Sequence, residues 1–261
     1  MLRSHPFVAG GPSLSVVLPA YNEEAVIESS VRHVAEALRG LVDDYEIIVV
    51  DDGSRDRTRA ILAALQAREP DTRLRVVTHE RNQGYGAALA SGFSAARKEL
   101  IFFTDGDGQF DVAELSGFLA AMNEGTDLVI GWRARRADPP LRRLNAWGWK
   151  LLVHGLFGYT ARDVDCAFKL FRRTVWESVT VRARGATFSA EFLVKARRLG
   201  FHVEELPVSH FPRAAGSATG ASLSVIVRAF VELIELRRTL PREPGSGQRC
   251  RRPERREAHV G

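Results

Sequence analysis

The chain has 261 residues, of which 45% are hydrophobic and 26% are charged, the composition of an ordinary globular protein. This length suits one α/β domain of roughly 200–250 residues with short extensions. The composition excludes a disordered, collagen-like or disulfide-framework protein, and no uncharged apolar run approaches the ~20 residues that span a bilayer, which excludes a polytopic membrane protein.

The formal net charge of +5 is unevenly spread along the chain. Residues 242–261 hold six Arg and three Glu, so this segment alone supplies +3. We interpret residues 241–261 as a disordered, solvated basic tail, with contact to an anionic membrane or to nucleic acid as the alternative. No zinc site is indicated, because Cys166 and Cys250 form no CxxC pair. The cysteine usage and the lack of a signal-peptide pattern predict a cytoplasmic protein.

The first half of the chain alternates short apolar runs with helical patterns after a loose arm at residues 1–12. The predicted strands are residues 14–18, 46–50, 74–77, 100–103 and 127–130. Between them the sequence predicts helices, the first beginning at Glu23 with Asn22 as its cap. The apolar face of that helix is Ile27, Val31, Val34 and Leu38. Such alternation predicts a mostly parallel sheet flanked by helices.

The second half changes character. Residues 141–159 combine tryptophans, leucines and cationic side chains, as in a helix at a membrane surface, although core packing of an amphipathic helix is the alternative. A late strand is predicted at residues 203–208, followed by an amphipathic helix from Leu223. We therefore expect one domain over residues 13–240.

Polar side chains follow three of the predicted strands. Because the carboxyl ends of parallel strands meet at one edge of a sheet, these groups are expected to lie together. Asp105 and Asp107 flank a glycine after a buried strand, and such a pair suits Mg²⁺ or Mn²⁺. Asp52 offers an acceptor to a ring N–H of uracil or guanine, while Tyr21 either stacks on a base or packs in the core. Arg133 is expected directly after a strand, where its guanidinium suits a phosphate.

Several segments together resemble one known family. They are LPAYNEE (18–24), VVDDGSRDRT (49–58), NQGYGAALASG (82–92), FTDGDGQFD (103–111), GWR (131–133), DVDCAFKLFRR (163–173) and the RxxG at 213–216. In order and spacing these segments resemble the family 2 glycosyltransferases of the GT-A fold, and among them the dolichyl- or polyprenyl-phosphate sugar (mannose) synthases. The resemblance covers about residues 14–240.

The resemblance implies a set of roles by position. The nucleotide-binding residues would be Pro19, Tyr21, Glu23, Val50 and Asp52. The metal and diphosphate would be held by Asp105, Asp107 and Gln109. Donor or acceptor phosphates would be bound by Gln109, Arg133, Arg142, Arg143 and Arg213. Asp163 matches the aspartate of the DxxxGF motif, although Ala167 replaces the glycine, and it would be the base for a hydroxyl acceptor.

The implied function is an inverting, metal-dependent transfer of a sugar from a nucleotide diphosphate to a polyprenyl phosphate. The implied cofactor is Mg²⁺ or Mn²⁺, with peripheral membrane association at the inner face and no nucleic-acid partner. The Ser-Lys pair and the C-terminal transmembrane helices of many relatives are missing, which leaves two alternatives open. These are a transferase acting on a soluble or polysaccharide hydroxyl and a non-catalytic nucleotide-sugar binding protein.

Overall fold

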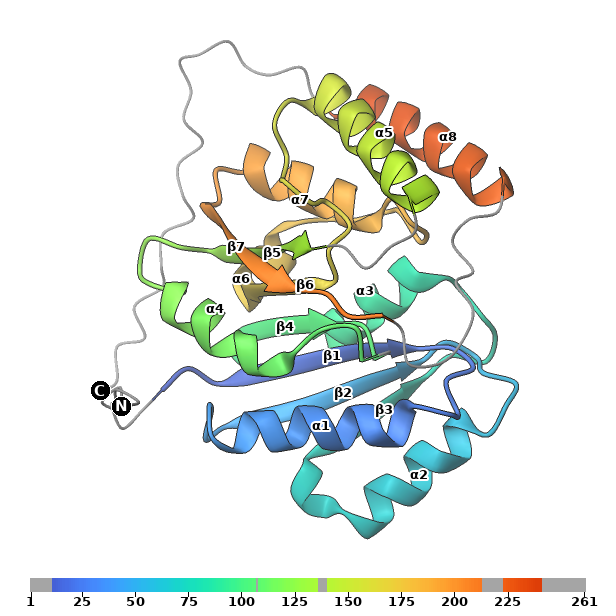
Figure 1. Ribbon diagram of the computed structural model, residues 1–261, viewed down its shortest axis with the longest axis vertical. Helices are drawn as coiled ribbons and strands as arrows, with labels where there is room; N and C mark the ends of the chain where they lie inside the picture. The colour runs from blue at the N-terminus through green and yellow to red at the C-terminus, as the bar shows by residue number, and fades with distance from the viewer. Residues whose placement is uncertain (1–10, 107, 136–139, 213–222, 241–261) are drawn as a thin grey trace.

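A computed structural model describes residues 11–106, 108–135, 140–212 and 223–240. Most of the predicted arm and the whole predicted tail lie outside these residues. In the described part, seven strands form one sheet in the order β3-β2-β1-β4-β6-β5-β7 (Figure 1). The strands are β1 (Leu14–Ala20), β2 (Tyr45–Asp51), β3 (Leu74–Thr78), β4 (Leu100–Thr104), β5 (Leu128–Arg135), β6 (Phe168–Arg172) and β7 (Val203–Ser209).

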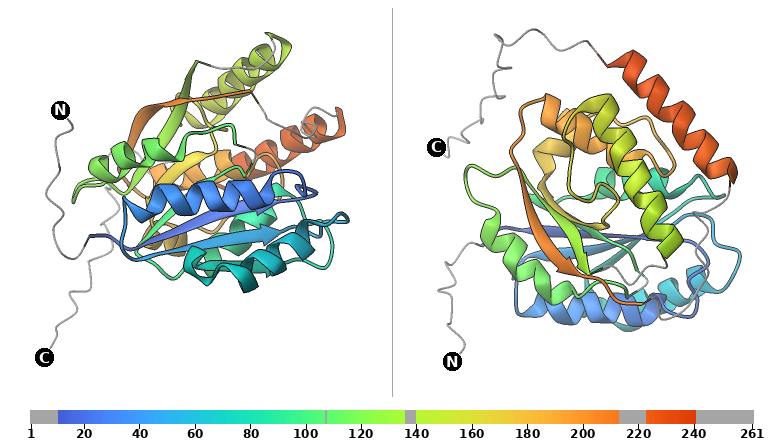
Figure 2. Two further views of the ribbon diagram at one scale, coloured as in Figure 1. Left: turned by 60° about the horizontal axis from the view of Figure 1, so that its bottom comes forward. Right: turned by 45° about the horizontal axis from the view of Figure 1, so that its top comes forward.

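Helices lie on both sides of this sheet (Figures 1 and 2). They are α1 (Ile27–Arg39), α2 (Thr58–Arg68), α3 (Tyr85–Ala95), α4 (Leu115–Ala121), α5 (Pro140–Phe157), α6 (Arg173–Ser178), α7 (Phe188–Arg198) and α8 (Leu223–Thr239), with short 3₁₀ turns η1 (Pro70–Thr72) and η2 (Val112–Glu114). All residues of β2 and β4 are buried, because helices cover both faces of these central strands. The predicted strands and the mostly parallel, Rossmann-like sheet are confirmed.

The start of the first helix was predicted wrongly. α1 begins at Ile27, and Asn22 adopts a left-handed backbone with φ of 56°. The Asn22 side chain does not cap the helix, since its Oδ1 accepts a hydrogen bond from the Arg55 backbone N–H at 2.8 Å. Asn22 therefore ties the end of β1 to the turn after β2. The predicted apolar face of α1 is nevertheless buried.

Strand β6 was not predicted from the sequence. It runs antiparallel between β4 and β5, whereas the other pairings are parallel. Its second residue is Lys169, which is fully buried and donates to the Cys166 backbone oxygen. A lysine inside a five-residue run hides the apolar pattern by which a buried strand is recognised.

The helices α5 and α8 pack against each other and lie at the end of the molecule away from α1 and α2 (Figures 1 and 2). Among the described residues, neither these nor any other helix combines the length and hydropathy needed to cross a bilayer.

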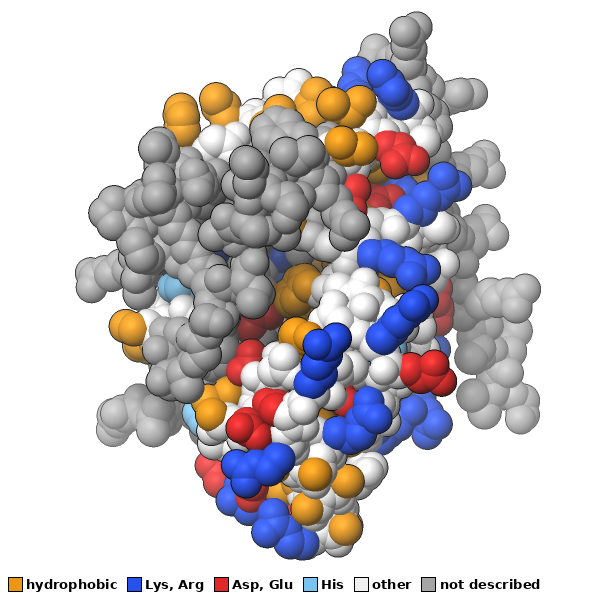
Figure 3. All heavy atoms as spheres, turned by 90° about the vertical axis from the view of Figure 1, so that its right-hand side faces the viewer, with side chains coloured by type: hydrophobic (Ala, Val, Ile, Leu, Met, Phe, Trp, Pro, Cys, Tyr) orange, Lys and Arg blue, Asp and Glu red, His pale blue; other side chains and the backbone are white. Residues whose placement is uncertain are grey.

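The parallel strands β1, β2 and β4 end at the same edge of the sheet, on the right-hand side of Figure 1. Figure 3 looks onto that edge. Hydrophobic side chains gather at the top of this face, where α5 and α8 lie (Figure 3). Lys and Arg side chains extend from the upper right to the bottom of the face, and in its lower half they are mixed with Asp and Glu side chains. The ends of β1, β2 and β4 are therefore on a side of the molecule that combines charged and apolar surface.

Candidate active site

The ends of β1 and β2 are joined by backbone hydrogen bonds. Pro19 pairs with Val50 in the sheet register, and the Asp52 N–H donates to Ala20 O at 2.8 Å. Tyr21 follows directly and is 37% exposed. Pro19, Tyr21 and Asp52, three of the predicted nucleotide-binding residues, are thus brought together at one point of the sheet edge.

Two further residues of that predicted set behave differently. The Glu23 N–H donates to Thr58 Oγ1 at 2.9 Å, which anchors the segment before α1 beside the other three. Val50 is fully buried, and Gly92 of α3 approaches so closely that a Cβ there would lie 3.1 Å from Val50 Cγ2. The Val50 side chain therefore packs in the core, and the predicted contact of this residue with a nucleotide stays a prediction.

Asp52 lies in a cradle formed by the segment between β3 and α3. Its Oδ1 accepts from His79 Nδ1 at 2.6 Å and from the Gln83 N–H at 2.8 Å. Its Oδ2 accepts from the Gly84 N–H at 2.9 Å. The carboxylate therefore fixes the position of residues 79–84 relative to the end of β2.

Asp105 stands at the end of β4, half-buried, and accepts a hydrogen bond from Tyr85 Oη at 3.0 Å. The loop after it is held at both ends, because Ser30 Oγ donates to Gly106 O and Gln109 Nε2 donates to Phe211 O at 3.0 Å. Asp107 lies outside the described residues, and the described part alone contains no cluster of three or more His, Cys, Asp or Glu side chains suited to a metal. Carboxylate and amide oxygens on an anchored loop are nevertheless a donor set that fits a hard divalent cation.

Arg133 lies within β5 rather than after it, since β5 continues five residues beyond its predicted end and pairs there with β7. Its guanidinium donates two hydrogen bonds to the Asp163 carboxylate, from Nε to Oδ2 at 2.7 Å and from Nη2 to Oδ1 at 2.8 Å. Burial alone would lower the pKa of Arg133, but the hydrogen bonds and charge of Asp163 outweigh it and raise that pKa. Arg133 stays cationic, with part of its donor fork committed to Asp163.

Asp165 and Lys169 were missed by sequence reasoning, although the DVD spacing before a strand was a signal. Asp165 reaches solvent, yet protein atoms crowd its carboxyl group. Burial first and the charge of Asp163 second raise the pKa of Asp165 to about 6, against the opposing effects of Lys169, Arg133 and a hydrogen bond from Trp149. A carboxyl group of this kind, at the mouth of a charged cluster, is suited to proton exchange near neutral pH.

The remaining predicted arginines are only partly placed. Arg142 and Arg143 belong to α5, but their side chains lie outside the description. Arg213 also lies outside the described residues. Their predicted roles as phosphate ligands stay predictions.

Asp165 is expected to reduce stability at neutral pH. Its pKa is higher in the folded chain than the ordinary 3.8, so the folded state binds the extra proton and stability falls as the pH rises from about 4 to about 6. Asp165→Asn should therefore melt at a higher temperature than wild type at pH 7.5, with the difference shrinking toward pH 4. Thermal melts across this range check it, and a pH-independent difference would contradict the raised pKa.

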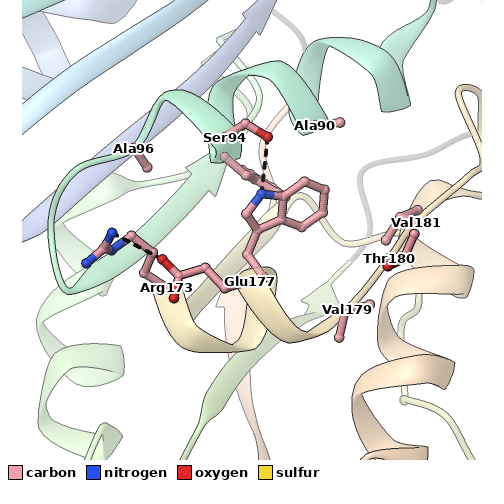
Figure 4. Close-up of a pocket in the computed structure, with 10 residues that line it drawn as sticks. Ala90, Ser94, Ala96, Arg173, Glu177, Val179, Thr180 and Val181 are labelled. Atoms are coloured by element: carbon pink, nitrogen blue, oxygen red, sulfur yellow. Dashed lines mark hydrogen bonds and ion pairs between the residues drawn. The ribbon is translucent and has the colours of Figure 1, made fainter. Parts of the chain in front are cut away.

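A separate pocket of about 420 Å³ opens beside α3 and α6 (Figure 4). Trp176 spans it and donates to Ser94 Oγ at 3.3 Å, and Arg173 pairs with Glu177 at its rim. Its described lining residues come from α3, α6 and the segments that follow them, and include none of the residues placed at the strand ends. The pocket is therefore separate from the site.

A comparison with known families identifies the family of the chain. The profile described as Glycosyl transferase family 2 matches residues 15–180, which is more than half of the chain. The chain belongs to glycosyl transferase family 2. The matched region contains every residue placed at the site above except Gln109's partner Phe211.

One group of curated relatives of this family 2 chain is named for a lipid carrier, undecaprenyl phosphate. It is 31% identical over 228 residues to the undecaprenyl-phosphate 4-deoxy-4-formamido-L-arabinose transferase of Pseudomonas fluorescens, covering 87% of this chain and 66% of the relative. It is 35% identical over 214 residues to the glycosyltransferase AglD of Haloferax volcanii, covering 78% of this chain and 34% of the relative. The chain thus spans about two thirds or less of the length of these relatives.

Solved structures show the same fold. Glucosyl-3-phosphoglycerate synthase of Mycobacterium tuberculosis, in complex with Mn²⁺, UDP and glucosyl-3-phosphoglycerate, aligns with a TM-score of 0.66 and 26% identity over 89% of this chain and 82% of that one. A complex of the same enzyme with Mn²⁺, UDP and phosphoglyceric acid aligns with a TM-score of 0.67 and 24% identity, over 89% and 80%. The GT-A fold implied by the sequence is confirmed.

Proposed function

We propose that this family 2 chain is an inverting, metal-dependent glycosyltransferase that moves a sugar from a nucleotide diphosphate to a polyprenyl phosphate at the cytoplasmic face of a membrane. The observation that carries the proposal is the shared face in Figure 3. The ends of β1, β2 and β4 and the helices α5 and α8 lie on this one side of the molecule (Figures 1 and 3). The undecaprenyl-phosphate transferases among the relatives support the choice of acceptor.

The donor nucleotide is placed at the ends of β1 and β2. Tyr21 offers an exposed ring for stacking, and Asp52, which is buried, offers an oxygen of its carboxylate to the base. Pro19 and Glu23 belong to the same segment at the end of β1 and remain proposed contacts.

The diphosphate is placed at the loop after β4. A divalent cation, Mg²⁺ or Mn²⁺, held by Asp105, Asp107 and Gln109 would offset the negative charge that the departing diphosphate gains. Tyr85 orients the Asp105 carboxylate, and Ser30 and Phe211 hold the loop at Gly106 and Gln109. The chain thereby holds Asp105 and Gln109 in a fixed arrangement, which removes the need to order these two side chains during the reaction.

The acceptor phosphate is placed on the Arg133 side of the site. An anionic phosphate oxygen needs no general base, so positioning and electrostatic stabilisation supply the catalysis. Attack on the sugar from the side opposite the diphosphate inverts its anomeric configuration. Arg133, fixed by Asp163, holds positive charge there, and Arg142, Arg143 and Arg213 remain proposed phosphate ligands.

The proposal is tested by incubating the full chain with labelled UDP- and GDP-sugars, Mn²⁺ and polyprenyl phosphate. We expect label to enter the organic phase in a reaction that requires all three components. Donor binding without transfer to polyprenyl phosphate would reject the lipid acceptor.

Membrane contact is expected through an apolar surface that we define as Trp147 and Leu151 of α5 with Val231 and Ile234 of α8. These side chains are 61%, 59%, 58% and 47% exposed. Apolar side chains of this size on adjacent amphipathic helices suit the headgroup boundary of a bilayer. Other apolar residues of α5 are partly buried against the core, as expected for an ordinary amphipathic helix. They are Trp149, Leu152, Leu156 and Phe157.

The variant Trp147→Glu with Leu151→Glu is expected to stay at the bottom of a flotation gradient with anionic liposomes, while wild type rises with them. The two introduced glutamate charges prevent the apolar surface from inserting into the bilayer, and they leave the donor site unchanged. Leu199→Glu, at the exposed end of α7, is the matched control and should float like wild type. If wild type also stays at the bottom, the membrane proposal fails.

A hydroxyl acceptor is the second candidate, and Asp165 is the observation that favours it. Hydroxyl transfer needs a general base, for which Asp163 was the predicted residue. Asp163 is instead gripped by Arg133, whereas Asp165 is exposed and has a pKa raised to about 6. Transfer to soluble sugars that is lost in Asp165→Asn, with no transfer to polyprenyl phosphate, would place this candidate first.

A further inference from the structure

Asp52, His79 and Ser91 form a hydrogen-bonded chain that links β2, the end of β3 and α3. His79 Nδ1 lies 2.6 Å from Asp52 Oδ1, and His79 Nε2 lies 2.9 Å from Ser91 Oγ. The side chains of His79 and Asp52 are 8% and 4% exposed. A carboxylate only accepts, so the Nδ1–H of His79 donates to Asp52 in either the neutral or the charged form of the ring.

The contacts of Asp52 leave room for one more donor. A carboxylate has about four acceptor positions, two on each oxygen. Oδ1 already accepts from His79 and from the Gln83 N–H, so both of its positions are used. Among the residues that the structure describes, the Gly84 N–H is the one donor to Oδ2. One acceptor position on Oδ2 therefore remains.

The neighbouring backbone keeps this arrangement rigid. Gly53 has a φ of 71°, and a Cβ on it would lie 2.5 Å from the backbone carbon of Arg81. Gly84 has a φ of 101°, and a Cβ there would lie 2.6 Å from Arg184 O. The turn after β2 and the segment before α3 are thus in direct backbone contact. This contact fixes the N–H groups of Gln83 and Gly84 beside the Asp52 carboxylate.

The bases of nucleotide donors differ in how many hydrogen bonds they can donate to such a carboxylate. Guanine presents a ring N–H and an adjacent amino group, and it pairs with a carboxylate through both oxygens. Uracil presents the single N3–H. A guanine at Asp52 would have to displace His79 or Gln83 from Oδ1 or leave one of its own donors unsatisfied, and either is costly in an enclosed site.

We infer that His79, oriented by Ser91, is a positioning residue that restricts Asp52 to a base with one ring N–H, so that the donor carries uracil and not guanine. This inference rests on the proposed function, because it takes the strand-end site to bind a nucleotide-diphosphate sugar. It chooses between the two bases that the sequence alone left open.

Binding of UDP and GDP to the full chain, by calorimetry in the presence of Mn²⁺, tests the inference. We expect UDP to bind at least about tenfold more tightly than GDP, and at least about tenfold more tightly than N3-methyl-UDP, which has lost the ring N–H. His79→Leu removes the donor to Oδ1, and the preference for UDP over GDP should narrow to within about threefold. His79→Asn places an amide donor near the same point and is the matched control, expected to keep the preference.

The outcomes separate this inference from the function on which it rests. If GDP binds as tightly as UDP, or N3-methyl-UDP as tightly as UDP, the inference is wrong while a nucleotide-sugar site stands. If His79→Leu, shown to be folded by its melting curve, keeps the wild-type preference, His79 does not set it. The N3-methyl comparison uses only wild-type protein, so it decides the role of the ring N–H even where a variant fails to fold. If neither nucleotide binds, the proposed function and the inference fall together.

Discussion

Replacing Asp105 with asparagine is expected to lower turnover at least about 100-fold, because it removes a carboxylate ligand of the divalent cation that would offset the negative charge gained by the leaving diphosphate. The exchange preserves volume, and Asp105 is only half-buried, so the melting temperature should stay close to that of wild type. Transfer rates at limiting Mn²⁺ measure the effect. EDTA should abolish wild-type activity, and added Mg²⁺ or Mn²⁺ should restore it.

Two variants in the same region serve as controls for Asp105. Asp111→Asn should retain nearly full activity, because Asp111 accepts from the Ala113 N–H at the start of η2 and asparagine caps equally well. Tyr85→Phe removes the 3.0 Å hydrogen bond to Asp105 and should reduce turnover by less than Asp105→Asn does. An Asp105→Asn enzyme with near wild-type turnover at limiting metal would refute the metal site. Asp107→Asn is expected to behave as Asp105→Asn does.

The sequence predicted the central sheet because its strands carry nearly unbroken apolar runs. The β2 segment Ile47–Val50 has no polar residue, and burial on both faces is the physical cause of that pattern. Strand β6 was not predicted because Lys169 interrupts its apolar run. The start of α1 was misplaced because the Asn22 side chain accepts a hydrogen bond from Arg55, which is 33 positions away in the chain. Local patterns contain no information about a partner so distant in the chain.

The candidate site was predicted in position but not in its contacts. Strand ends converge by a general rule of parallel sheets, so Asp52, Asp105 and Tyr21 could be grouped from sequence. That His79 and two backbone N–H groups hold Asp52 depends on how the segment after β3 folds back onto β2, which no spacing reveals. The same holds for Arg133, whose partner Asp163 comes from a segment 30 residues further along the chain.

The pair of Arg133 and Asp163 is expected to contribute strongly to stability as long as both partners are present. Arg133→Met leaves the Asp163 carboxylate, which is 8% exposed, without its two charged donors. Removing one partner of such a pair should lower the free energy of unfolding by about 3–5 kcal/mol. For a domain of this size that corresponds to a melting temperature lower by roughly 10 °C. Arg173→Ala breaks an exposed pair with Glu177 and should cost less than about 0.5 kcal/mol.

The double variant Arg133→Met with Asp163→Leu separates the structural role of the pair from its functional one. Without either charge, the site is filled by apolar side chains of similar size, and most of the lost stability should return. Sugar transfer should not return, because the positive charge of Arg133 beside the acceptor phosphate is still missing. Urea denaturation and the transfer assay are run on all three variants in parallel. A double variant that regains both stability and transfer would show that Arg133 serves only to neutralise Asp163, and it would remove Arg133 from the proposed phosphate site.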